Sequence, residues 1–465
     1  MKRISYHPFT TGMAFAAAAA ASTSALAQGP QNLLPAPQPR IEAEAPAVPP
    51  PAQADGSLAA DFDAAITRQV DPMVQSWSVA QAEALVDVIR AIGTEGLDPS
   101  DYRLEAVANA IATGPSPALD EAASRSFAWL AEDLRDGRTP MDARKQWFVF
   151  DPDADRYPTG RLMKAALATG DIAGTLASLN PVHPDYALLR DELAKAAPGT
   201  KRAKLIRANM ERWRWLPREL GFQYLMTNVP EYQLRLTVND QIISTYRTIV
   251  GKPGRSATPQ MAEMVEGVIF NPNWTVPQSI VKGEGLGARV LGNPGWAKRN
   301  GYTAKKGANG WVTVIQQPGP QNALGLMKLD MPNKHAIFLH DTPSRGLFDR
   351  EKRALSHGCI RTERASELAV TMAILGAGIS PDEGAGHLTS RKYTKVGFNK
   401  QMPVYITYFT IGRDIEGNLA TFNDIYGRDA PVIASLEAPR KANRSRVTGE
   451  QIIPIEDDMR IALAD

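Results

Sequence analysis

The chain has 465 residues, with 52 lysines and arginines against 50 aspartates and glutamates, and a formal net charge of +2. This balance makes nucleic acid a poor candidate partner, because attraction to a phosphate backbone relies on an excess of positive charge. The length exceeds what one compact core organises, so two or more domains are expected. The single cysteine, Cys359, excludes a disulfide within the chain.

The N-terminus has the pattern of a secretory signal peptide. A positively charged start precedes a mostly alanine run at 13–21, and Ser24–Ala27 ends in the small residues that precede a cleavage site. The apolar run is too short to span a bilayer, and no later run approaches its length. We therefore expect residues 1–27 to be removed on export and no transmembrane span. Residues 28–57 are rich in proline and alanine and should form an extended linker.

Residues 58–200 predict a helical domain. Apolar residues recur at helical spacing in two stretches, and Gly93 and Gly137 stand where each helix should stop. The residues with this spacing are Leu85, Val88, Ile89 and Ile92 in the first stretch, and Phe127, Leu130 and Leu134 in the second.

A basic amphipathic helix is predicted from about Lys201 to Trp215. We expect its apolar face to pack on a neighbouring domain, and attachment to a membrane surface is the alternative. The apolar face consists of Leu205, Ile206, Met210 and Trp213.

Beyond this helix the apolar period becomes two, which predicts a β-rich domain. A β-hairpin is predicted from the alternating residues up to Val238, the turn pair Asn239–Asp240 and the run Ile242–Val250. Val404–Phe409 should be the last core strand. Residues 279–317 are rich in glycine, lysine and asparagine and lack clear periodicity. We expect this segment to be a long loop that works as a mobile lid.

The strongest chemical signal runs from His340 to Cys359. A short apolar strand ends at His340, and Cys359 closes the sequence Ser-His-Gly-Cys. A lone thiol with histidines nearby indicates nucleophilic catalysis, because an imidazole can take the proton of the thiol. A small buried apolar side chain is the alternative for an isolated cysteine. A metal site is disfavoured, because there is no second cysteine and no zinc-ligand spacing.

This pattern of a histidine followed by Ser-His-Gly-Cys resembles the signature of the L,D-transpeptidase family with a YkuD-type catalytic domain, whose members cross-link bacterial peptidoglycan. Leu130–Arg138 is similar to the helical scaffold domain of the large, YcbB-type branch. The resemblance implies an α+β multidomain fold: a β-rich catalytic domain, an N-terminal helical scaffold domain and a lid insertion. One departure is clear, because Pro181–Leu193 runs almost directly into the basic helix. That leaves no room for the peptidoglycan-binding module of many large relatives.

The predicted boundaries divide the chain into five parts. They are a signal peptide (1–27), a linker (28–57), a scaffold domain (58–200), a catalytic domain (201–412) with its lid at about 279–317, and a C-terminal extension (413–465). The basic cluster in the extension should be solvated surface, and it consists of Arg440, Lys441, Arg444 and Arg446.

The resemblance also implies catalytic roles. Cys359 matches the nucleophile of the family and His340 its general base, with the carbonyl of Asp341 as a candidate to orient the imidazole. His357 receives an orienting or oxyanion role. The backbone amides of Gly358 and Cys359 are expected to form the oxyanion hole.

Four residues are expected to bind substrate. Arg361 is placed to hold a carboxylate, because a guanidinium fork fits one. Ser356 belongs to the same loop and should also hydrogen-bond within it. Trp274 lies in a segment that lines the cleft in relatives, and Asp341 is the fourth residue.

The implied reaction begins when Cys359 attacks the third residue of a donor stem tetrapeptide and expels the terminal D-alanine. The acyl group then passes to the side-chain amine of a diaminopimelate in a neighbouring stem, giving a 3→3 cross-link in the periplasm. No metal and no organic cofactor is implied. Transfer to water, as in an L,D-carboxypeptidase, and transfer to an outer-membrane protein are the alternatives. A non-catalytic wall-binding scaffold is the alternative from another class, and other cell-wall enzymes are further candidate partners.

Overall fold

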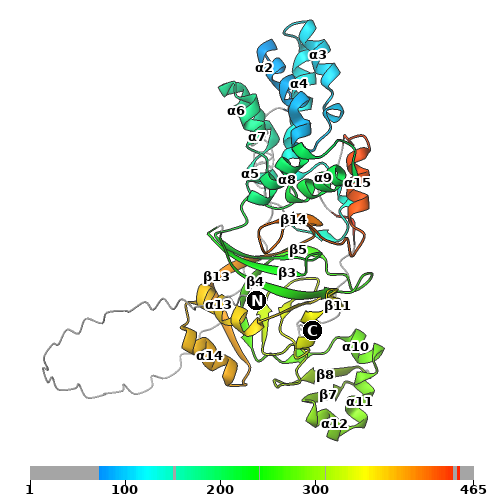
Figure 1. The fold of residues 1–465 in the computed structure, drawn as a ribbon, viewed down its shortest axis with the longest axis vertical. Coiled ribbons are helices and arrows are strands. Elements are labelled where there is room, and N and C mark those ends of the chain that lie inside the picture. The colour runs from blue at the N-terminus through cyan, green and yellow to red at the C-terminus, as the bar shows by residue number, and fades with distance from the viewer. Residues whose placement is uncertain (1–72, 150–152, 240, 309, 443–447, 451–465) are drawn as a thin grey trace, which may run out of the picture. The chain divides into compact units, whose positions relative to one another are not determined.

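The computed structural model describes residues 73–149, 153–239, 241–308, 310–442 and 448–450. The predicted signal peptide and linker lie outside these residues. The described part is an α+β structure in which N-terminal helices precede a β-rich domain, as predicted (Figure 1).

The N-terminal helices bury a core of their own. Ser78 and Gln81 form a reciprocal capping box at the start of α2 (Val79–Ala91). This helix continues as a 3-10 turn over Ile92–Glu95 and ends at Gly96, whose φ is 75°. The α-helix itself ends at Ala91 with Ile92 as its C-cap, so the predicted stop at Gly93 is confirmed, and Gly96 supplies the left-handed conformation that closes the 3-10 turn. The helices are α2 (Val79–Ala91), α3 (Leu104–Ala112), α4 (Pro117–Asp136), α5 (Asp153–Arg156), α6 (Thr159–Thr169) and α7 (Ile172–Ala177).

Two further helices, α8 (Pro184–Lys195) and α9 (Lys201–Trp213), join the helical part to the strands. The apolar face of α9 packs with Tyr224 and Tyr405 of the sheet, and Ile206 and Met210 are fully buried there. The expectation that this helix packs on a neighbouring domain is confirmed. Among the described residues, no helix is long and apolar enough to cross a membrane.

The β-rich domain is a closed ring of strands. The sheet runs β5-β13-β2-β3-β4-β12-β10-β9, and pairing of β9 with β5 closes it. The predicted hairpin is confirmed, since β3 and β4 pair antiparallel with Val238 opposite Gln241. The strands of this sheet are β1 (Trp147–Phe148), β2 (Gln223–Asn228), β3 (Gln233–Val238), β4 (Gln241–Gly251), β5 (Gln260–Phe270), β9 (Met327–Asp330), β10 (Leu339–His340), β11 (Ala354–Ser356), β12 (Ile360–Thr362) and β13 (Thr394–Thr407).

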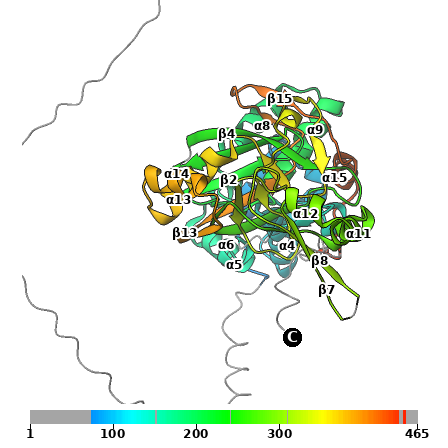
Figure 2. The same ribbon diagram turned by 90° about the horizontal axis from the view of Figure 1, so that it is seen from below.

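Alternate residues of these strands fill the interior of the ring. Leu234, Leu236, Val265 and Ile406 are fully buried in one cluster. Helix α13 (Ala365–Ala377) packs on the same cluster, and α14 (Pro381–Thr389) packs beside α13. Figure 2 shows both helices on one side of the strands, with α11 and α12 on the other.

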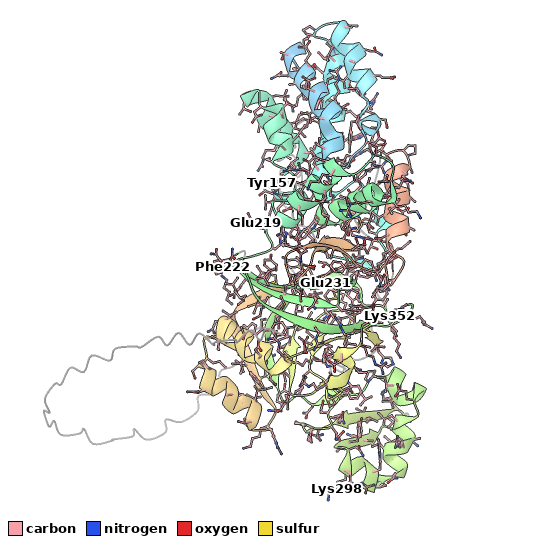
Figure 3. The ribbon with its side chains drawn as sticks, viewed as in Figure 1. Tyr157, Glu219, Phe222, Glu231, Lys298 and Lys352 are labelled. Carbon is pink, nitrogen blue, oxygen red and sulfur yellow. The ribbon has the colours of Figure 1, made fainter. Side chains whose placement is uncertain are left out.

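The segment predicted as a long loop is a folded subdomain. Its strands form a separate sheet in the order β6-β8-β7, and its helices cover a small core of Val276, Val281, Val290 and Val314. The prediction of a long loop was wrong. The apolar residues of this small core are spaced irregularly in the sequence, so they show neither a helical nor a strand period. We call residues 274–316 the lid subdomain, and Figure 3 shows Lys298 at its far end. Its elements are β6 (Trp274–Thr275), α10 (Gln278–Gly283), α11 (Leu286–Gly292), α12 (Pro294–Arg299), β7 (Tyr302–Lys306) and β8 (Val312–Gln316).

The C-terminal segment returns to the scaffold helices. It forms β14 (Ile411–Arg413), β15 (Leu419–Thr421) and α15 (Asp429–Glu437). The Arg440 side chain is only 1% exposed and binds Asp133 and Glu132 of α4. The expectation that Arg440 is solvated was wrong, because its carboxylate partners lie far away in the sequence. Arg444 and Arg446 lie outside the described residues.

This ion pair predicts a measurable effect on stability. Replacement of Arg440 by alanine should lower the free energy of unfolding by about 3 kcal/mol, because the fully buried Asp133 carboxylate loses its Arg440 partner. Urea unfolding of Arg440→Ala measures the change. Lys441→Ala is the matched control, since its pair with Asp142 is exposed and should contribute at most about 0.5 kcal/mol. Equal shifts for the two variants would contradict the prediction.

Candidate active site

Strand pairing brings the predicted catalytic residues to one place. In the parallel pair of β10 and β12, Leu339 lies opposite Ile360 and His340 lies opposite Arg361. Leu339 and Ile360 are fully buried inside the ring. Side chains alternate along a strand, so His340 and Arg361 share the other face. Cys359 lies in the bend directly before β12, two residues from Arg361, so the strand pairing places it next to the strand that carries His340.

The His340 imidazole is held in one orientation and one tautomer. Its Nδ1 lies 2.5 Å from the backbone carbonyl oxygen of Asp341. A carbonyl only accepts hydrogen bonds, so this contact assigns the ring proton to Nδ1 and leaves the Nε2 lone pair as the acceptor. Burial, assisted by the positive charge of Arg361, lowers the pKa of His340 to about 3. The imidazole is therefore neutral near pH 7.

The Asp341 carboxylate holds the backbone around this site. It accepts hydrogen bonds from the backbone N–H groups of Leu326 and Thr342 and pairs with Arg345 at 2.7 Å. A Cβ on Gly325, whose φ is 60°, would lie 2.3 Å from a carboxylate oxygen. The prediction that Asp341 binds substrate was wrong for its side chain, because the carboxylate is buried and already bound.

Cys359 lies directly before β12, near the buried cation Arg361. Its Sγ is 3.5 Å from the carbonyl oxygen of Ala336. Burial lowers the pKa of Arg361, and the neighbouring Cys359 partly opposes that shift. The Nε of Arg361 is buried without a hydrogen-bond partner among the described residues. Proximity of a guanidinium favours the ionised form of a thiol.

The loop between β11 and β12 is held by its own hydroxyl group. Ser356 Oγ donates to the carbonyl oxygen of Cys359 at 2.6 Å and accepts from the N–H of Gly358 at 3.1 Å. Gly358 has a φ of 129°, which requires glycine. The expected hydrogen bonding of Ser356 within its loop is confirmed, and the side chain is buried rather than directed at substrate. The expectation for the Gly358 amide needs correction, because its N–H faces Ser356 rather than an oxyanion.

His357 and Trp274 lie toward the lid subdomain. The imidazole of His357 is half exposed, and its Nε2 is 3.9 Å from a carboxylate oxygen of Glu284. Trp274 pairs with Gln316 of β8 and packs on the lid core. Within the described residues, no three His, Cys, Asp or Glu side chains gather as a possible metal site.

Sequence reasoning missed one residue that touches this loop. The Thr258 Oγ donates a hydrogen bond of 2.7 Å to the carbonyl oxygen of Gly358. Thr258 precedes a proline in the loop after β4, far from the motif in sequence. Nothing in its local pattern indicates this contact, because only the fold brings the two loops together.

The site combines a thiol directly before β12 with an oriented, neutral imidazole on the paired strand β10, and acyl-transferring enzymes use these two groups. Residues 223–406 match the family model of the L,D-transpeptidase catalytic domain, YkuD, and residues 75–193 match the Scaffold domain model. The chain therefore carries an L,D-transpeptidase catalytic domain preceded by a scaffold domain.

Individual relatives are similar over part of the chain. A Haemophilus influenzae protein named "Putative L,D-transpeptidase" is 31% identical over 223 residues, and the match covers 45% of each chain. The chain thus spans less than half the length of this curated relative. L,D-transpeptidase 1 of Mycobacterium tuberculosis is 12% identical, with 40% of this chain and 61% of that chain covered and a TM-score of 0.18. An L,D-transpeptidase from Mycobacterium smegmatis is 13% identical, with 40% and 58% covered and a TM-score of 0.20.

The buried neutral imidazole predicts a dependence of stability on pH. Between pH 6.5 and about 3 the unfolded chain binds a proton at His340 that the folded chain does not, so this contribution to stability falls as the pH falls. At pH 5 the loss should be about 2 kcal/mol relative to pH 7.5.

A non-titrating variant isolates this contribution. His340→Asn keeps a donor toward the Asp341 carbonyl, and its loss of unfolding free energy between pH 7.5 and 5 should be smaller than that of the wild type by this amount. The comparison is needed because burial raises the pKa of Asp341, which acts in the opposite direction. Identical pH profiles for the two proteins would show that His340 is not buried as a neutral group.

Proposed function

We propose that this protein is a cysteine L,D-transpeptidase that forms 3→3 cross-links between peptidoglycan stem peptides through a thioester on Cys359. One observation carries the proposal: the pairing of β10 with β12 places His340 opposite Arg361, two residues after Cys359, and the Asp341 carbonyl orients the His340 ring. A thiol needs a base to become a strong nucleophile, and the available lone pair of His340 is such a base.

In the first half-reaction, the Cys359 Sγ attacks the carbonyl carbon of the third residue of the donor tetrapeptide. The thiol proton moves to Nε2 of His340, and the carbonyl oxygen becomes an oxyanion. When the tetrahedral intermediate collapses, the C–N bond breaks and His340 returns the proton to the leaving D-alanine amine. The acyl group remains on Cys359 as a thioester.

In the second half-reaction, the side-chain amine of an acceptor diaminopimelate attacks the thioester carbonyl. His340 takes a proton from the amine, the C–S bond breaks, and the proton returns to the thiol. The neutral resting state of His340 suits both steps, because each begins with an imidazole that accepts a proton. Arg361 supports both, since its charge stabilises the departing or attacking thiolate.

The proposed place of action is the periplasm, and the predicted signal peptide at 1–27 supports it. The lid subdomain approaches the motif through Glu284 and His357. A cover on this side favours transfer to an amine over hydrolysis, because it limits access of water to the thioester.

Replacement of the nucleophile tests this function directly. Cys359→Ala and Cys359→Ser should abolish 3→3 dimer formation from purified disaccharide-tetrapeptide, with unchanged thermal unfolding, because only one small side chain differs. Mass spectrometry of the products measures dimer, tripeptide and unreacted tetrapeptide. Dimer from the alanine variant would refute the assignment. Tripeptide without dimer from the wild type would instead identify an L,D-carboxypeptidase.

The two histidines should respond differently to pH. His340→Ala should slow acylation by about 100-fold or more at pH 7 and recover in part as the pH rises, because the thiol then ionises without a base. His357→Ala should show no such recovery, since its half-exposed ring faces the lid subdomain. Acylation rates between pH 6 and 10 measure this difference. Recovery by the His357 variant alone would exchange the two roles.

A further inference from the structure

Two hydroxyl groups hold the backbone on either side of Cys359. Ser356, within the loop, binds the carbonyl oxygen of Cys359. Thr258, from outside the loop, binds the carbonyl oxygen of Gly358. The Thr258 hydroxyl also accepts a hydrogen bond of 2.9 Å from the N–H of Gly251, and its side chain is fully buried. Its one proton is therefore committed to Gly358.

The bond from Thr258 sets the direction of a peptide unit. The C=O of Gly358 and the N–H of Cys359 belong to one planar trans peptide and point in opposite directions. Holding the carbonyl toward Thr258 therefore directs the N–H of Cys359 away from it. The N–H of Gly358 is directed at Ser356, so the Cys359 N–H is the amide of this pair whose direction Thr258 controls.

Thr258 itself is braced by the C-terminal segment. The Tyr426 hydroxyl donates to the carbonyl oxygen of Gly251 at 2.6 Å and accepts from the N–H of Thr258 at 3.3 Å. A Cβ on Gly251 would lie 1.8 Å from the carbonyl oxygen of Ser256, so the two sides of this loop approach as closely as backbone allows. Tyr426 thus links Thr258 to Gly251, as the hydrogen bond between Gly251 and the Thr258 hydroxyl also does.

A buried arginine completes the brace. The Arg428 guanidinium donates to the carbonyl oxygen of Thr258 at 3.1 Å and also contacts Gln146. It lies between the rings of Tyr408 and Tyr426, at 4.9 and 4.8 Å from their centroids. A buried charge is costly unless it is well bound, so an arginine held here on carbonyl oxygen, amide and ring contacts serves a geometric purpose.

We propose that Thr258 is a positioning residue that aims the N–H of Cys359 at the oxyanion of the acyl-transfer intermediate, and that Tyr426 and Arg428 hold Thr258 in place. This inference rests on the proposed function, because it concerns the same reaction. It assigns the C-terminal segment, which contacts Gly251 and Thr258 through Tyr426 and Arg428, to support of the transition state. A correctly aimed donor contributes strongly, because it binds charge that exists only in the transition state.

The test compares two reactions of the same thiol. Acylation by imipenem or disaccharide-tetrapeptide passes through an oxyanion, whereas alkylation by iodoacetamide displaces iodide at a saturated carbon and forms none. Thr258→Val removes the hydroxyl and keeps the shape. It should slow acylation by about 10- to 100-fold and leave alkylation within about twofold of the wild type. Thr258→Ser keeps the hydroxyl and should retain acylation near the wild-type rate.

Tyr426→Phe provides a second variant if Thr258→Val fails to fold, which thermal unfolding reports. It should also lower acylation selectively, by a smaller factor, because Thr258 keeps its own bond to Gly358. Unchanged acylation in the folded variants, or an equal fall of acylation and alkylation, would overturn the inference. A wild-type protein that is alkylated but never acylated would refute the proposed function instead, so the two failures are distinguishable.

Discussion

The pairing of β12 with β10 on one side and β4 on the other is the constraint on which the site depends. Strand β4 also pairs with β11, so both ends of the Ser-His-Gly-Cys loop are bound to one strand. Leu339 and Ile360 direct one face of β10 and β12 into the core. Burial of this apolar pair therefore decides which face carries His340 and Arg361, because a slip of one residue would exchange the two faces.

Burial explains the electrostatic state of the site. An exposed histidine would be partly protonated near pH 6.5, whereas His340 is neutral well below that value. The Asp341 carbonyl orients the ring, and the Asp341 carboxylate binds backbone amides and Arg345. One residue thus orients the base with its backbone and supports the adjoining turn with its side chain. The base is kept neutral without losing its orientation.

The scaffold and catalytic parts are joined by buried polar contacts rather than by a linker alone. A Cβ on Gly137, at the end of α4, would lie 2.6 Å from the ring of Trp215. Glu211 of α9 accepts from the N–H of Thr139, and Arg212 binds Asp429 of the C-terminal segment. These contacts connect the scaffold helices, through the C-terminal segment, to the loop that holds Thr258. Positioning of the catalytic loop is therefore a property of the whole described part of the chain.

The sequence by itself determined the elements with a strong local period and the residues with distinctive chemistry. Sequence patterns predicted the helices around Leu85 and Phe127, the hairpin at Asn239, and His340 and Cys359 as candidate catalytic residues. Apolar spacing and a lone thiol are local signals. They did not predict the fold of the lid subdomain, the buried state of Arg440 or the hydrogen bonds between Tyr426 and the Thr258 loop. Each depends on contacts between residues far apart in the chain. The hydrogen bonds and charge pairs of such residues leave no periodic pattern in the sequence, so only the tertiary structure decided which carbonyl groups of the loop are held by Ser356 and Thr258.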